Sequence, residues 1–161
     1  MKVKLNTILF FLCVTPLVVF SQKSIGTKDL IKINENLESN WTGVSFKKRV
    51  EISTNPVGTN VDVAEKGYKF LELAIRIKNT SKEKLNVDLS KFQLVDNDSN
   101  VYDADLCQAN NLNKIYCDKF DFKIKPNKKR IVIINFKPLI SENSSVKAIR
   151  YDGMDIYEFD K

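Results

Sequence analysis

The chain has 161 residues, carries 26 lysines and arginines against 20 acidic residues, for a formal net charge of +6, and contains no histidine. That length fits one domain. The absence of histidine excludes Ser-His-Asp and Cys-His mechanisms and metal sites built on imidazole.

Residues 1–21 have the pattern of a secretory signal peptide. A basic start with Lys2 and Lys4 leads into an apolar run over 8–20, and Ser21 is a small residue before the expected cleavage at Gln22. The run is shorter than the roughly 20 apolar residues that a membrane-spanning helix needs. We therefore expect a secreted or periplasmic protein, without stable membrane insertion once the leader is removed. Without the leader's two lysines, 24 basic residues face 20 acidic ones, a net charge of +4.

Removal of the leader would also remove Cys13 and leave Cys107 and Cys117. An even pair in an oxidising compartment predicts one disulfide. It would close a loop of about 10 residues and stabilise the fold by about 2 to 3 kcal/mol. Two buried thiols are the alternative.

Residues 22–40 are polar, with scattered apolar side chains. Leu30, Ile33 and Leu37 follow one another at spacings of three and four, which allows a short helix. A flexible lead-in fits equally well. The folded domain is expected to occupy 41–161.

From Trp41 onward, apolar and polar residues alternate, as they do in half-buried β-strands. The clearest strand is 69–79. Burying its apolar face is worth about 1.5 to 3 kcal/mol per side chain if a second sheet covers it. A lone hairpin cannot supply that cover, so the pattern predicts a sandwich. Four branched side chains form this face: Leu71, Leu73, Ile75 and Ile77.

Further strands are expected between turn signals rich in Gly, Pro, Asn and Asp. The strand at 130–136 is nearly continuous in apolar residues, which predicts a central place with both faces covered and an end at Pro138. About seven to nine short strands without long helical patterns indicate an antiparallel sandwich or barrel. The expected strands are 42–54, 61–64, 69–79, 85–95, 101–105, 120–124, 130–136 and 146–151, and the tail 154–161 could finish the sheet.

A series of turn and core motifs resembles a known family. Its order is a strand ending in Asn-Thr-Ser, a strand, Phe-x-Leu-x-Asp, a hairpin and a tyrosine. This order is similar to the bacterial secreted immunoglobulin-like domain of unknown function (DUF4352-like), a group related to a secreted immunogenic antigen. The resemblance covers about 44–152 and implies an all-β, antiparallel immunoglobulin-like β-sandwich, with no catalytic site to carry over. The motif residues are Gly67 to Leu71, Lys78 to Glu83, Phe92 to Asp98, and Tyr102.

Oxygen-bearing side chains are concentrated after the Phe-x-Leu-x-Asp motif. Asp96, Asp98 and Asn100 alternate like the first ligands of a calcium loop. However, Val101 stands where such a loop needs glycine, and Cys107 stands where it needs glutamate. A hairpin turn explains the same residues without a metal. We therefore expect no metal site beyond this calcium candidate.

Other residue groups allow alternative functions. A glycosidase needs two acids that flank a cleft, and nothing in the sequence brings Glu72, Asp103 and Asp121 together. Basic clusters at 47–49 and 128–130 fit soluble strand edges better than an anionic polymer. Aromatic residues could form a sugar-stacking or protein-binding patch, although core burial explains most of them. These aromatics are Trp41, Tyr68, Tyr116, Tyr151 and Tyr157.

The sequence thus predicts an exported, non-catalytic domain with a binding or surface-interaction role and no cofactor. Rigid strands would present loops to an unknown protein or glycan partner, and no nucleic acid is expected. The oligomeric state is left open. The alternatives are a calcium-stabilised extracellular domain and a hydrolase with a carboxylate pair. The candidate contacts lie at the loop 107–117 and at Asp96, Asp98, Asn100 and Asp103.

Overall fold

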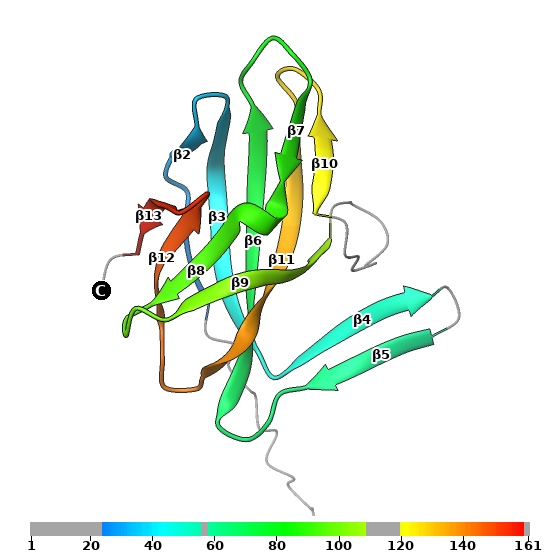
Figure 1. The fold of residues 1–161 in the computed structure, drawn as a ribbon, viewed down its shortest axis with the longest axis vertical. Helices are drawn as coiled ribbons and strands as arrows, with labels where there is room; N and C mark the ends of the chain where they lie inside the picture. Colours follow the sequence, from blue (N-terminus) through cyan, green and yellow to red (C-terminus); the bar gives the residue numbers. More distant parts are fainter. Residues whose placement is uncertain (1–23, 56–57, 109–119, 160–161) are drawn as a thin grey trace, which may run out of the picture.

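The computed structural model describes residues 24–55, 58–108 and 120–159 (Figure 1). Within these ranges the only helix is η1 (Leu89–Lys91), a single 3₁₀ turn, and the other elements are strands. The all-β prediction is confirmed. The strands are β1 (Ser24–Thr27), β2 (Ile31–Asn34), β3 (Leu37–Lys47), β4 (Arg49–Asn55), β5 (Gly58–Val63), β6 (Tyr68–Asn79), β7 (Leu85–Asp88), β8 (Phe92–Asp96), β9 (Val101–Gln108), β10 (Asp121–Ile124), β11 (Lys129–Ser141), β12 (Val146–Tyr151) and β13 (Met154–Glu158).

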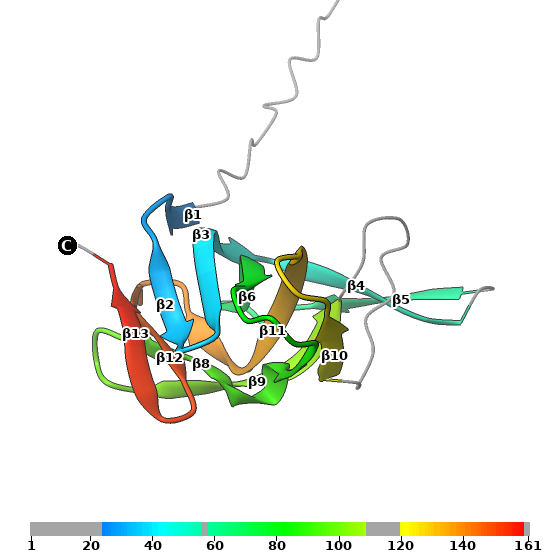
Figure 2. The ribbon, with the colours of Figure 1, turned by 90° about the horizontal axis from the view of Figure 1, so that it is seen from above.

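One long antiparallel sheet forms the body of the molecule, in the order β1-β3-β6-β11-β9-β8-β12-β13, with β2 also paired to β3. The sheet curls over into two facing layers. Figure 1 shows β8 and β9 crossing the long strands β3, β6 and β11, and Figure 2, turned by 90°, shows them across the core. Two small sheets, β7-β10 and β4-β5, complete the described part, and the β4-β5 hairpin extends away from the body (Figure 1).

The core lies between the two layers of the curled sheet. On β6, Leu71, Leu73, Ile75 and Ile77 are each 0 % exposed. Phe92 of β8 and other apolar side chains of the second layer belong to the same cluster. The predicted burial of this strand face beneath a second layer is therefore confirmed.

Residues 24–34 differ from the flexible or partly helical lead-in that we expected. They form β1 and β2, which pair with successive parts of β3. Ile31 and Ile33 are both 2 % exposed, whereas Leu30 is 60 % exposed. Burial at every second position is the period of a strand. The helical spacing was misleading because Leu30 does not belong to the buried set.

The strand β11 is longer than predicted. It pairs with β6 and β9, which confirms its central place. Pro138 does not end it, because pairing resumes at Ile140 after a register shift that follows Phe136. Proline has no N–H to donate, so it fits where the ladder is irregular. The outer face of β11 is partly open, since Ile131 is 41 % exposed.

The described residues form thirteen strands, whereas the sequence pattern indicated about seven to nine. The additional strands are short or lie at edges. The lead-in contributes β1 and β2, the segment 42–54 is divided between β3 and β4, and the segment 85–95 is divided between β7 and β8. Short edge strands carry too few alternating residues for the pattern to separate them from loops.

The two faces of β11 allow a matched test of the core. Replacing Ile134, which is 0 % exposed, by alanine should lower the free energy of unfolding by about 3 kcal/mol, because it leaves a cavity in the core. Ile131→Ala, on the outer face, should lower it by less than about 1 kcal/mol. Urea unfolding of both variants measures the difference. Equal effects would contradict the placement of the core on one face of β11.

Candidate functional site

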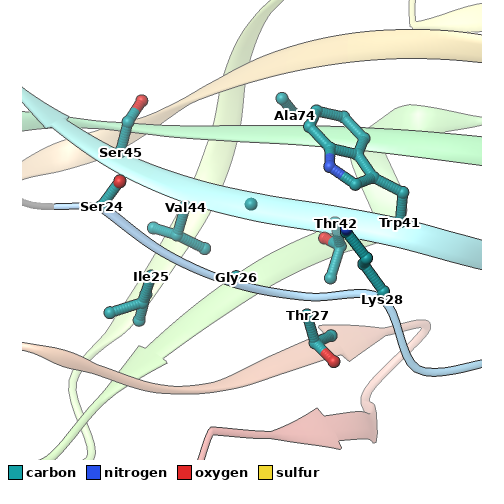
Figure 3. Close-up of a pocket in the computed structure, with 11 residues that line it drawn as sticks. Ser24, Ile25, Gly26, Thr27, Lys28, Trp41, Thr42, Val44, Ser45 and Ala74 are labelled. Atoms are coloured by element: carbon teal, nitrogen blue, oxygen red, sulfur yellow. The ribbon is translucent and has the colours of Figure 1, made fainter.

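A groove of about 430 Å³ runs along β1, β3 and β6 (Figure 3). Small residues line it, among them Gly26, Gly43 and Ala74, which are partners across the three strands. Trp41 and Lys28 also line this groove. In Figure 3 the indole lies beside Ala74, on the same side of β3 as Ser45. We call this feature the Trp41 groove.

A bulge in β3 gives Trp41 its direction. Ser39 is paired with Ile77 and Thr42 with Ile75, so β3 has one residue more than β6 between these pairs. The bulge is held by Ser39, whose hydroxyl donates to the Trp41 carbonyl at 2.8 Å and accepts from the Trp41 N–H at 3.3 Å. An extra residue of this kind redirects side chains. It lets both halves of β3 keep their apolar residues inward while the indole points outward.

Trp41 has a cation over its ring. The guanidinium carbon of Arg76, on β6, is 5.8 Å from the ring centroid. That distance lies within the range of a cation–π interaction, which is worth about 0.5 to 1 kcal/mol at a partly exposed site. The contact steadies both side chains. Because Lys28 lines the same groove, the indole is bordered by two cations.

The two glycines of the groove have different roles. A Cβ at Gly26 would lie 2.7 Å from the Thr42 carbonyl oxygen, so only glycine allows β1 to approach β3 this closely. A Cβ at Gly43 would meet only the Ile25 carbonyl oxygen, at 3.8 Å, which is an ordinary contact. The fold therefore needs glycine at 26. At 43 the glycine leaves open space in the groove.

No carboxylate is found among the described residues that line the Trp41 groove. Glu72 lies beside it, opposite Ser45, but is only 5 % exposed. The Ser45 hydroxyl donates to Glu72 Oε1 at 3.2 Å, and Lys47 Nζ lies 2.6 Å from Oε2. This pairing neutralises the nearby acid, so the cations at the Trp41 end set the sign of the local potential.

The predicted loop site is organised around Asp96, which is 0 % exposed. Its Oδ1 accepts from the N–H groups of Asp98 and Asn100, at 2.9 and 2.8 Å. Its Oδ2 accepts from the Asn100 side-chain amide at 2.9 Å and from the Tyr102 hydroxyl at 2.8 Å. Burial raises the pKa of Asp96, but these four hydrogen bonds outweigh burial and leave that pKa below its ordinary value. Burial and the bond to Asp96 raise the pKa of Tyr102.

This geometry makes Asp96 a support for the hairpin between β8 and β9. Donors occupy the carboxylate oxygens that a calcium ion would need. Asp98 and Asn100 are exposed at the turn, and Asp103 accepts from Gln93 Nε2 at 2.7 Å on the neighbouring strand. In the described part of the chain, no three Asp, Glu, Cys or His side chains form a metal site. The calcium candidate receives no support, and a partner contact at Asp98, Asn100 or Asp103 stays a prediction.

The remaining candidate residues do not gather in one site. Cys107 is buried, whereas Cys117, Tyr116 and most of the loop 107–117 lie outside the described residues, so the disulfide stays a prediction. Glu72, Asp103 and Asp121 lie on β6, β9 and β10.

A second cavity, of about 280 Å³, lies between the β2-β3 turn and β7. Its lining includes one carboxylate, that of Glu35, so neither described cavity holds a carboxylate pair. The hydrolase alternative receives no support from these cavities. Tyr151 also lines the second cavity. Its side chain is 7 % exposed and packs on Phe92, with ring centroids 4.7 Å apart.

Sequence reasoning selected Trp41 but not its neighbours. Tyr68 is 45 % exposed at the start of β6, and Tyr157 donates to Asp29 at 3.0 Å, so neither joins Trp41. Lys28, Gly43 and Arg76 were missed because only strand pairing brings them to the indole. A glycine inside a strand pattern was the one available signal, since it often marks a close approach of backbone or ligand.

Comparisons with known proteins give a family and a fold. The family model described as "Domain of unknown function (DUF4352)" matches residues 31–157. An uncharacterized β-sandwich protein from Clostridium difficile 630 is similar in structure, with 18 % sequence identity and a TM-score of 0.51 over 80 % of this chain and 87 % of that chain. At this identity the similarity shows the sandwich fold alone. No curated protein matches the chain. Among the described residues, no helix is long and apolar enough to cross a membrane.

The Asp96 network predicts an acid-sensitive contribution to stability. Because the folded-state pKa lies below the unfolded value of about 3.9, the carboxylate stabilises the fold above that value and loses this effect as pH falls through the folded pKa. Asp96→Asn should therefore lower the free energy of unfolding by about 2 to 4 kcal/mol at neutral pH.

The difference between Asp96→Asn and the parent should be smaller near pH 2, because the unfolded carboxyl binds a proton there that the folded Asp96, with its lowered pKa, resists. Chemical unfolding at the two pH values measures it. The control is Asp98→Asn, an exposed change that should alter stability by less than about 0.5 kcal/mol. A difference of the same size at both pH values would contradict the role given to the Asp96 carboxylate.

Proposed function

Because the chain belongs to the family of the domain of unknown function DUF4352, whose description names no activity, we propose a function from the site itself. The protein is an exported, non-catalytic β-sandwich domain that binds a ligand outside the cytoplasm in the Trp41 groove. The observation that carries this proposal is the open space above Gly43, beside an outward-facing indole on paired strands.

Glycine at position 43 destabilises β3, and a binding role for the space above it would explain why glycine is present. Glycine within a strand destabilises it by about 0.5 to 1 kcal/mol relative to alanine. At Gly26 the close contact with Thr42 gives a structural reason for glycine, but at Gly43 a Cβ has room. Paired strands also hold the groove rigidly, which limits the entropy lost when a ligand binds.

The chemistry of the groove supports binding rather than catalysis. The chain has no histidine, and the lining of the groove, as far as the structure describes it, includes no Asp or Glu. Its polar side-chain groups are hydroxyls, the Trp41 indole N–H and the Lys28 ammonium, which can hold a ligand. Nucleophilic or general acid–base chemistry would need an activating neighbour.

Trp41 is the only tryptophan in the chain, so its fluorescence reports directly on the groove. Titrations with neutral oligosaccharides, acidic oligosaccharides and peptides should show at least one class that changes its emission saturably. Gly43→Val should abolish this change, because the added side chain occupies the space in the groove.

Two controls keep this test decisive. Tyr68→Ala, an exposed aromatic of β6 outside the groove, should bind like the parent. Urea unfolding must show that Gly43→Val is folded, and Gly43→Ala serves if it is not. The proposal fails if no class of ligand changes the Trp41 emission, or if a folded groove-filling variant binds like the parent.

Export is proposed from the basic start and apolar run of residues 1–21. The full chain expressed in a bacterial host should be recovered from the periplasm or medium with Gln22 as its first residue, as measured by mass spectrometry. Replacing both Lys2 and Lys4 by glutamate should keep more of the chain in the cytoplasm. Recovery of the parent chain from the cytoplasm with residues 1–21 intact would refute export.

A further inference from the structure

The outer face of the sheet next to the Trp41 groove carries like charges at adjacent positions. Lys78 of β6 is paired directly with Lys129 of β11, and Arg76 is two residues before Lys78 on the same face. Directly opposed side chains in an antiparallel pair lie about 4.5 to 5.5 Å apart at Cβ, and like charges there destabilise the sheet. The sheet keeps this arrangement in spite of its cost.

Few acids offset these cations. Glu38 of β3 lies opposite both Lys78 and Lys32, and Lys78 Nζ is 2.7 Å from Glu38 Oε1. Asp29 follows Lys28, and its Oδ2 accepts from the Thr27 hydroxyl at 2.6 Å and from the Tyr157 hydroxyl at 3.0 Å. Among the described residues, the five cations of the cationic face are offset by the carboxylates of Glu38 and Asp29, which leaves an excess of three positive charges. The cations of this face are Lys28, Lys32, Arg76, Lys78 and Lys129.

The Trp41 groove adds a second kind of contact. Arg76 belongs to the cationic face and also lies over the indole, so the charged surface and the groove are continuous. The groove presents an aromatic surface and the hydroxyls of Ser24 and Ser45. A sugar ring can pack its C–H groups on an indole and hydrogen-bond to hydroxyls. Negatively charged substituents of such a sugar would then lie against the cationic face.

A peptide strand fits this surface less well. Peptides that extend a sheet pair with a strand edge, but residues 42–45 of β3 are already paired with β1 on one side and with β6 on the other. The groove lies on the faces of these strands, where only side chains are offered. Single-stranded nucleic acids stack successive bases on several aromatics, whereas Trp41 is the one aromatic among the described residues of this groove.

We infer that the ligand of the Trp41 groove is an anionic polysaccharide, with a sugar ring against Trp41 and the carboxylates of neighbouring sugars on the cationic face. This inference rests on the proposed function and adds the chemical class of the ligand. A repeating acidic polymer matches cations that are spread over several neighbouring strands, because successive charges can meet successive side chains.

The test compares four probes by Trp41 fluorescence and calorimetry: an oligogalacturonate, a dextran oligosaccharide of matched length, poly-L-glutamate and single-stranded DNA. The oligogalacturonate should bind most tightly, and raising the salt concentration from about 0.05 M to about 0.5 M should weaken it strongly by screening. Lys129→Ala should weaken binding about two- to fivefold, and Arg76→Ala more, with partial recovery in Arg76→Lys. Lys147→Ala, an exposed lysine on β12, should bind like the parent.

The outcomes separate this inference from the proposed function. If dextran changes the Trp41 emission as strongly as the oligogalacturonate does, the groove binds sugars regardless of their charge. The inference is then wrong, while the proposed function stands. Tighter binding of poly-L-glutamate or DNA assigns the groove to another polymer and likewise refutes the inference alone. If no probe binds, and Gly43→Val changes nothing, both proposals fail.

Discussion

The burial of one face of β6 is the constraint on which the rest of the structure depends. Leu71, Leu73, Ile75 and Ile77 are fully excluded from water, and this requires a second layer across them. The chain supplies that layer by curling its long sheet through β11, so that β8, β9 and β12 return over the core. Once the inner face is closed, the alternation of side chains commits Arg76 and Lys78 to the outer face, where they meet solvent.

The bulge in β3 reconciles this constraint with the candidate site. Without an extra residue, one half of β3 would turn its apolar side chains outward. With it, Leu37 and Val44 are both buried, and Trp41 is left on the outer face beside Arg76. The hydroxyl of Ser39 satisfies the backbone at this point. A packing requirement and the candidate binding site therefore depend on the same bulge.

The polar groups of the β8-β9 hairpin are likewise used within the fold. A row of Asp and Asn residues invites a metal or partner interpretation, yet the buried carboxylate of Asp96 satisfies the turn and anchors the Tyr102 hydroxyl. Buried charges are stable when hydrogen bonds compensate their lost hydration. At Trp41 the situation is reversed, because Gly43 leaves a space that the fold does not need.

The sequence by itself determined the longer strands from β3 onward and the buried face of β6, because side-chain alternation is a local property that does not depend on how the sheet is arranged. The hairpin turn at 96–100 could be predicted for the same reason, since the Asp and Asn residues that favour a turn act locally. The sequence also identified Trp41 as a candidate aromatic residue. It did not identify Arg76 or Gly43 as neighbours of Trp41. Only the tertiary structure decided which residues surround Trp41, because the register between β1, β3, β6 and β11 sets which residues lie side by side. A register follows from the packing of whole layers and from a single-residue bulge, neither of which leaves a local mark in the chain.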